Sequence, residues 1–149
     1  MPTSHPLHEI FHRTSYRVRL RRGGVAVIRV GESLPPALLN TLPESDTPWG
    51  FITACNPRGQ TRPRESNRRA MHMLRNALRE QAPNARLCAA CGALGSWREP
   101  SLFVVDASHS VLDQLMQRFD QLAIVRGRGA SPAELHWSRW VQHVMDDPT

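Results

Sequence analysis

Short apolar runs constrain the fold of this chain more than any other feature. Residues 51–55, 102–105 and 122–125 are apolar almost throughout, yet each run has only four or five members. Runs of this length predict buried strands, because a helix shows a longer amphipathic pattern. They also fall far short of the ~18 apolar residues that a membrane-spanning helix needs. We therefore expect a sheet-based protein that has no membrane segment.

Turn signals and helical periodicity lie between and around these runs. Residues 16–20 and 25–30 alternate around a Gly-Gly pair, which predicts a β-hairpin. Residues 134–137 are expected to pair with the strand before them across a turn at 126–129. Helices are predicted at the C-terminal end and over three further segments: 35–42 with Ser33 as its cap, 63–81, and 110–119 with Ser110 as its cap.

These elements predict a single α/β (α+β) domain over residues 1–149. Its core would be a mixed β-sheet of about five to six strands with helices packed against it. Apolar residues make up 40% of the chain, which is enough for one core at this length. Residues 84–97, rich in Gly, Ala and Cys, are expected to form an irregular connection. The polar residues 1–13 are expected to form a flexible lead-in.

The chain is strongly basic and uses only one basic residue type. Its formal net charge is +6, and all 19 basic residues are arginine. A basic balance favours polyanionic partners such as nucleic acid. On the predicted helix 63–81, one exposed face holds Arg68, His72, Arg75 and Arg79, opposite the apolar side. This face is a candidate nucleic-acid surface, and its alternative interpretation is an ordinary solvated helix face.

The three cysteines give information about the cellular compartment and about metal binding. The N-terminus lacks the pattern of a secretory signal, and the number of cysteines is odd, so we expect reduced thiols and a cytoplasmic protein. Cys88 and Cys91 form a C-x-x-C pair, and Cys55 could add a third thiolate. Zinc usually takes four ligands from two such pairs. We therefore expect no metal and no cofactor, with these three cysteines as the alternative metal site.

The passage from strand 51–55 into helix 63–81 carries two asparagines. Asn67 falls on the core side of the helix, where an unsatisfied amide costs about 1–3 kcal/mol. Its partner must be Asn56, the carbonyls of the turn, or a ligand. A strand end followed by a helix N-terminus is also a usual place for an anion. The passage is either a binding site or a pinned turn.

Four motifs in this order resemble a small bacterial family known only as a domain of unknown function. They are FITACNP at 51–57, ESN at 65–67, WREPS at 97–101 and FDQ at 119–121, and FHRTSY at 11–16 is similar to the family's Y-x-x-T-x-Y opening. The resemblance covers most of the chain. It implies one polar cluster but no activity, and the cluster would comprise Thr53, Asn56, Asn67, Glu99, Ser101 and Gln121.

The chain departs from the family pattern at three places. Cys55 stands where the pattern has Trp, Asp120 stands where it has Gly, and Ser66 separates Glu65 from Asn67. The first change removes bulk beside the implied cluster.

Three functional hypotheses follow. The first is a small anionic or nucleotide-like ligand bound at the polar cluster, with Arg68 nearby. The second is an enzyme in which Glu99 acts as general acid or base, since a carboxylate at the rim of an apolar strand can titrate near neutral pH. The alternative for Glu99 is a structural ion pair. The third is a protein that associates with nucleic acid through the basic helix face.

Overall fold

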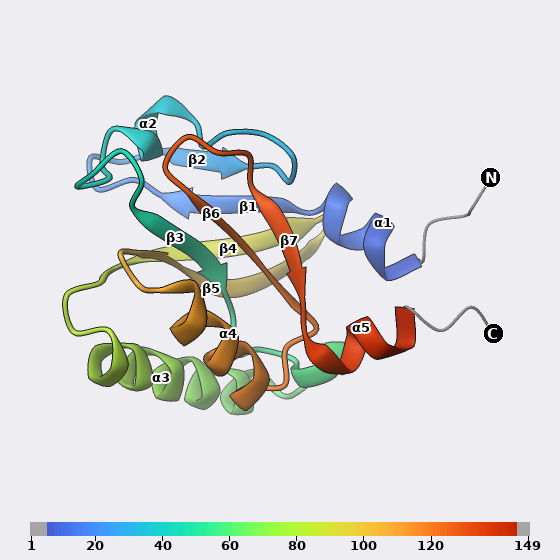
Figure 1. The fold of residues 1–149 in the computed structure, drawn as a ribbon. Coiled ribbons are helices and arrows are strands. Elements are labelled where there is room, and N and C mark those ends of the chain that lie inside the picture. The colour runs from blue at the N-terminus through green and yellow to red at the C-terminus, as the bar shows by residue number, and fades with distance from the viewer. Residues whose placement is uncertain (1–5, 146–149) are drawn as a thin grey trace.

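The computed structural model describes residues 6–145, with side chains to residue 142, and centres on a seven-stranded sheet (Figure 1). Its strand order is β2-β1-β4-β5-β3-β6-β7, and every neighbouring pair is antiparallel. The strands are β1 (Ser15–Arg19), β2 (Val25–Ile28), β3 (Pro48–Ile52), β4 (Arg86–Leu94), β5 (Trp97–Val105), β6 (Ala123–Arg128) and β7 (Glu134–Trp137).

The sheet is curled, so that its two edges approach each other. Gly31 follows β2 and donates its N–H to the carbonyl of Ala133, which precedes β7, at 2.8 Å. Ala133 in turn donates to the carbonyl of Glu32 at 2.8 Å. Within residues 6–145 five α-helices surround the sheet, and α3 and α4 cover its outer face (Figure 1). They are α1 (Pro6–Arg13), α2 (Pro36–Leu39), α3 (Arg64–Gln81), α4 (His109–Arg118) and α5 (Arg139–Met145).

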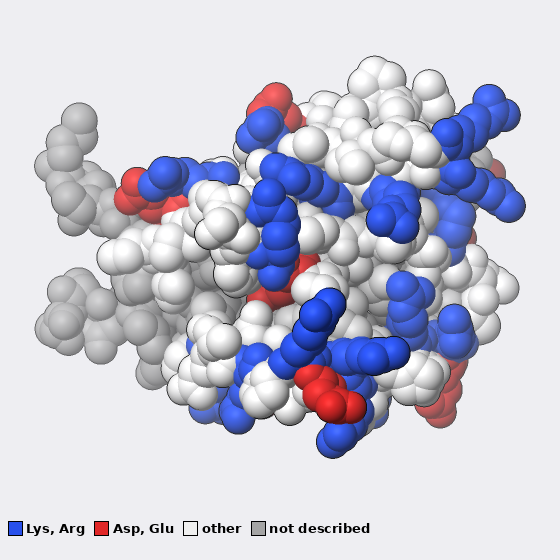
Figure 2. Space-filling model, turned by 180° about the vertical axis from the view of Figure 1, so that it is seen from behind, with Lys and Arg blue, Asp and Glu red and all other residues white. Residues whose placement is uncertain are grey.

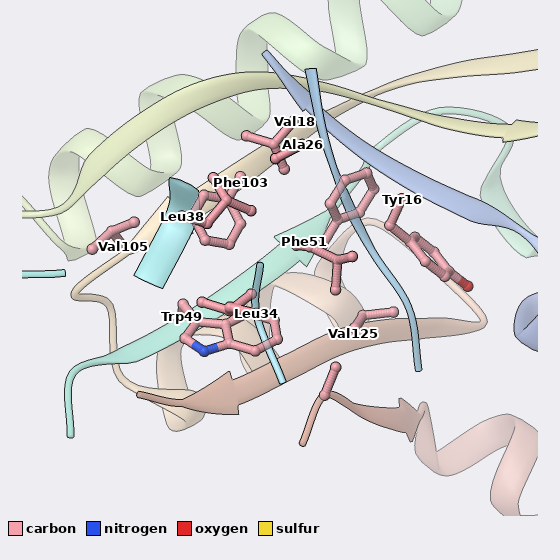
Figure 3. Close-up of a cluster of buried hydrophobic side chains, with 12 residues drawn as sticks. Tyr16, Val18, Ala26, Leu34, Leu38, Trp49, Phe51, Phe103, Val105 and Val125 are labelled. Carbon is pink, nitrogen blue, oxygen red and sulfur yellow. The ribbon is translucent and has the colours of Figure 1, made fainter. Parts of the chain in front are cut away.

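Side-chain alternation along the strands divides the core into two clusters. In β3, Trp49 and Phe51 face the inside of the curl, while Ile52 packs against the helices. The inner cluster runs from Val105 and Phe103 at one end to Phe51 and Tyr16 at the other (Figure 3). The outer cluster joins the sheet to Leu74, Ala77 and Leu78 of α3 and to Leu112, Leu115 and Met116 of α4.

The α/β class is confirmed. The sheet is antiparallel throughout the described residues and not mixed, and it has seven strands where five to six were expected. The difference is β4, because residues 84–97 are not an irregular connection. Residues 86–94 form a strand that pairs with β5 from Arg86 opposite Val105 to Leu94 opposite Trp97. Its small side chains carry little strand propensity by themselves, so the backbone pairing of the hairpin decides the structure. β6 likewise continues to Arg128, so the turn begins at Gly129.

Two predicted helix caps were wrong. The Ser33 hydroxyl donates to the carbonyl of Ala130 at 2.6 Å, and Pro35 stands at the start of α2. The hydroxyl of Ser108, not of Ser110, accepts from the N–H of Val111 at 3.1 Å and caps α4. In both cases the chain enters the helix at a different residue than the local pattern predicts.

The expected lead-in holds helix α1, and residues 1–5 lie outside the described residues. The Tyr16 hydroxyl donates to the carbonyl of Phe11 at 2.6 Å, and the ring of Phe11 meets Trp137 edge-on at 5.1 Å. These contacts dock α1 on the sheet. None of the helices within residues 6–145 is both long and apolar enough to span a membrane.

Candidate functional site

A pocket of about 260 Å³ opens at the Tyr16 end of the inner core, and we call it the Glu99 pocket. Its walls are mainly apolar and come from α1, β3 and β6, including Phe11, Phe51 and Val125. A few polar side chains interrupt this lining, as in most small-molecule sites. They are Thr14, Thr53, Asn56, Thr61, Glu99, Ser101 and Gln121.

Asn56 connects this pocket to helix α3. It adopts a left-handed backbone conformation, with φ 49°, where the chain leaves the β3 region for a single 3₁₀ turn (Pro57–Gly59). Its N–H donates to Oδ1 of Asn67 at 2.9 Å, and its own Oδ1 accepts from Nδ2 of Asn67 at 2.9 Å. The N–H of Arg62 donates to the same Oδ1 at 3.0 Å. The partner that Asn67 requires is therefore Asn56.

Glu99 lies on β5 and accepts a hydrogen bond from the side-chain amide of Asn56. The Nδ2 group of Asn56 donates to Oε2 of Glu99 at 2.9 Å. Burial raises the pKa of Glu99 to about 7, and this hydrogen bond opposes the rise. Glu99 forms no ion pair with any arginine or histidine in the part of the chain that the structure describes. The structural ion pair considered for this residue is therefore absent from the described contacts.

The other predicted polar residues bond to the backbone around Glu99. The Thr53 hydroxyl donates to the carbonyl of Pro100 at 2.7 Å, and Ser101 donates to the carbonyl of Glu99 at 3.1 Å. Gln121 donates to the carbonyls of Cys55 at 3.1 Å and Phe119 at 3.2 Å. The Thr53 bond links the end of β3 to β5, the Ser101 bond lies within β5, and the Gln121 bonds link Cys55 to the end of α4. Glu99 is the ionisable side chain of this cluster.

Five of the six residues in the implied cluster line the pocket, and Asn67 supports it from behind Asn56. The aromatic wall of Phe11, Tyr16, Phe51 and Trp97 was not among the predicted site residues. Only the similarity of residues 11–16 to the family's opening motif pointed to Thr14 and Tyr16. Leu7 and Ile10 of α1 also line the pocket, and no sequence signal pointed to them, because this segment has the composition of a flexible terminus.

A known family model matches the segment of the chain that carries this cluster. Residues 52–124 match the family model described as Protein of unknown function (DUF3293). The match confirms the resemblance to a domain of unknown function, and it includes Thr53, Asn56, Asn67, Glu99, Ser101 and Gln121. No curated protein and no solved structure matched the chain.

The basic residues of α3 lie apart from the Glu99 pocket. Arg68 does not line it, although the residue was predicted to assist a ligand there. Arg68, His72 and Arg79 are exposed, and Arg75 is half-buried. Arg75 and Arg79 line a separate groove of about 250 Å³ between the end of α3 and the start of β4. Seen from behind, the molecule carries many basic side chains and few acidic ones (Figure 2).

The alternative metal site is not assembled. Cys88 and Cys91 are three residues apart on β4, so strand alternation directs them to opposite faces of the sheet. Cys88 packs against the inner core, and buried Cys55 lies 3.6 Å from the carbonyl of Pro100. Among residues 6–142, no group of three or more His, Cys, Asp or Glu side chains could hold a metal ion.

Proposed function

We propose that this protein binds a small molecule in the Glu99 pocket. The observation that carries the proposal is the position of Glu99. This carboxyl group faces an apolar pocket, is held by Asn56, and has no cationic partner among the described side chains. An apolar cavity with a few oriented polar groups is the usual form of a small-molecule site.

The lining of the pocket favours a different type of ligand from the one expected from the sequence. An anionic or nucleotide-like ligand needs positive side chains or free N–H groups at the site. None of the described residues that line the pocket is an arginine or a histidine. The cluster thus supports a ligand with an apolar body and a hydrogen-bond donor rather than an anion.

A melting screen of the full chain against a library of small ring compounds tests this function. A ligand that binds only the folded state raises the melting temperature with increasing concentration. We expect hits whose stabilising effect is reduced in a Phe51→Ala or a Glu99→Gln variant. An unrelated variant, Glu80→Gln on the exposed part of α3, should respond like the wild type. Hits that are equally effective on all variants would place binding elsewhere.

Acid–base catalysis at the same residue is a second candidate function. A pKa of about 7 allows Glu99 to exchange a proton near neutral pH, as a general acid or base must. In this scheme Asn56 orients the carboxyl group, and Asn67 positions Asn56. Turnover of a compound found in the screen, lost in Glu99→Gln while binding persists, would identify an enzyme. Binding without turnover supports the binding function alone.

Nucleic-acid binding through α3 is a further candidate, carried by a different observation. Arg68, Arg75 and Arg79 form no ion pair with any acidic group in the described part of the chain. Their charges are therefore available to phosphates, whose neutralisation releases counterions.

A further inference from the structure

We propose that the Glu99 pocket selects a small molecule in which a protonated amine is attached to a single ring or a short apolar body. This inference rests on the proposed binding function and assigns the ligand class. The sequence led us to expect an anionic ligand, whereas the pocket favours a cationic one. Three properties of the pocket carry the inference: the carboxylate of Glu99 has no cationic partner, the walls are aromatic, and the volume is small.

The first property is an incomplete set of partners around the carboxyl group. Asn56 reaches Oε2 of Glu99, and no donor in the described part of the chain reaches Oε1. A carboxylate removed from water must be paired with a cation or take up a proton. The folded chain offers it no described arginine or histidine partner. An ammonium group on the ligand supplies both the positive charge and the missing N–H donors.

The second property is the aromatic wall beside the carboxyl group. The rings of Tyr16 and Phe51 meet edge-on with their centres 5.2 Å apart. Figure 3 shows both residues at the same end of the inner cluster. Trp97 and Phe11 also line the pocket. Aromatic faces attract cations, and they bury the apolar part of a ligand at the same time. The pocket therefore combines two interactions that favour an ammonium group over a carboxylate.

The third property is size. The volume of about 260 Å³ is close to the lower end of the range for ligand pockets, which is about 300–1,000 Å³. This space suits a one-ring compound and is too small for a dinucleotide. An alkylamine that carries one phenyl ring, such as phenethylamine, is thus a suitable probe.

Two titratable groups that interact electrostatically with Glu99, Tyr16 and Cys55, stay uncharged around neutral pH. Burial raises the pKa of Tyr16 on β1 and that of Cys55 after β3. The Tyr16 hydroxyl also donates to the carbonyl of Phe11, and α1 contributes only Leu7, Ile10 and Phe11 to the pocket. Among the described residues that line the pocket, Glu99 is therefore the group whose charge changes between pH 5.5 and 8.

Three probes with the same ring distinguish the ligand class: phenethylamine, neutral 2-phenylethanol and anionic 3-phenylpropionate. Calorimetric titration of the full chain at pH 8 should show phenethylamine binding at least about tenfold more tightly than 2-phenylethanol, a difference of about 1.4 kcal/mol. The carboxylate should bind most weakly. At pH 5.5 a group with a pKa of about 7 is ionised only to about 3%, so amine binding should weaken by up to about 30-fold.

Glu99→Gln should abolish the preference for the amine and its pH dependence, and it should leave 2-phenylethanol binding in place. Glu80→Gln, which removes an exposed carboxylate from α3, is the control and should behave like the wild type. If Glu99→Gln does not fold, the comparison of wild-type amine binding at pH 8 and pH 5.5 still tests the ligand class.

The outcomes separate the two proposals. If 2-phenylethanol binds and the amine has no advantage at pH 8, the ligand class is wrong and the binding function stands. Tighter binding of 3-phenylpropionate would overturn the ligand class in favour of an anion. If none of the three probes binds, both the ligand class and a ring-sized binding pocket are contradicted.

Discussion

Asn56 and Asn67, eleven residues apart in the chain, exchange two hydrogen bonds of 2.9 Å each. One bond satisfies the backbone N–H of Asn56, and the other joins the two side-chain amides. Together they hold the left-handed turn after β3 against the first turns of α3. The remaining amide donor of Asn56 is then directed at Glu99. A structural pair of asparagines thus places the carboxyl group of the candidate site.

Replacing Asn67 tests the importance of this pair. Asn67→Leu leaves the N–H of Asn56 without its acceptor, and an unsatisfied buried group costs about 1–3 kcal/mol. We expect the free energy of unfolding, measured by urea denaturation, to fall by that amount. Asn76→Leu is the control, because Asn76 is exposed on the same helix, and it should change stability by less than about 0.5 kcal/mol. Equal effects of the two substitutions would contradict a special role for Asn67.

The raised pKa of Glu99 predicts a pH dependence of stability. The folded state holds the proton up to a pKa of about 7, whereas the ordinary value is 4.5. The contribution of protonated Glu99 is complete below pH 4.5 and is lost as pH rises through 7. Urea denaturation from pH 4.5 to 8 should show the wild type losing stability relative to Glu99→Gln. Parallel curves for the two proteins would show that Glu99 titrates normally.

Alanine at Gly127 on β6 is predicted to destabilise the fold. A Cβ atom at this position would overlap the ring of Trp49, which is fully buried and donates from Nε1 to the carbonyl of Gly129. Overpacking of this kind costs about 1–3 kcal/mol. Gly127→Ala should therefore lower the melting temperature. At Gly92 on β4, a Cβ atom would have its nearest neighbours at 3.8 Å, so Gly92→Ala should leave the melting temperature almost unchanged.

Nucleic-acid association predicts a steep and localised salt dependence. If α3 contacts phosphates, Arg68→Glu with Arg79→Glu should weaken binding to duplex or single-stranded DNA and reduce the salt slope by about 1 per lost contact. Fluorescence anisotropy at several salt concentrations measures both quantities. Arg21→Glu with Arg22→Glu, in the β1–β2 turn, changes the net charge equally. Equal losses from both double variants would indicate attraction by overall charge, and undiminished binding by the α3 variant would exclude this surface.

Much of the fold could be predicted because its elements have strong local patterns. The long helix α3 begins and ends within one residue of the predicted 63–81, and the first hairpin pairs Tyr16 with Ile28. Strand β4 could not be recognised in the same way. Alanine, glycine and cysteine have little intrinsic preference for strands, and only pairing with β5 and β1 satisfies their backbone groups.

The order of residues by itself determined the α/β class, the pairing requirement of Asn67 and, through its motifs, the polar residues that gather around Glu99. The tertiary structure decided the chemistry of that site. Curling of the sheet and docking of α1 bring Tyr16 and Phe11 beside a carboxyl group more than eighty residues later in the chain. Arg68 is exposed on α3 and does not line the pocket. Charge near a site depends on which faces meet in space, and the local sequence pattern does not contain that information.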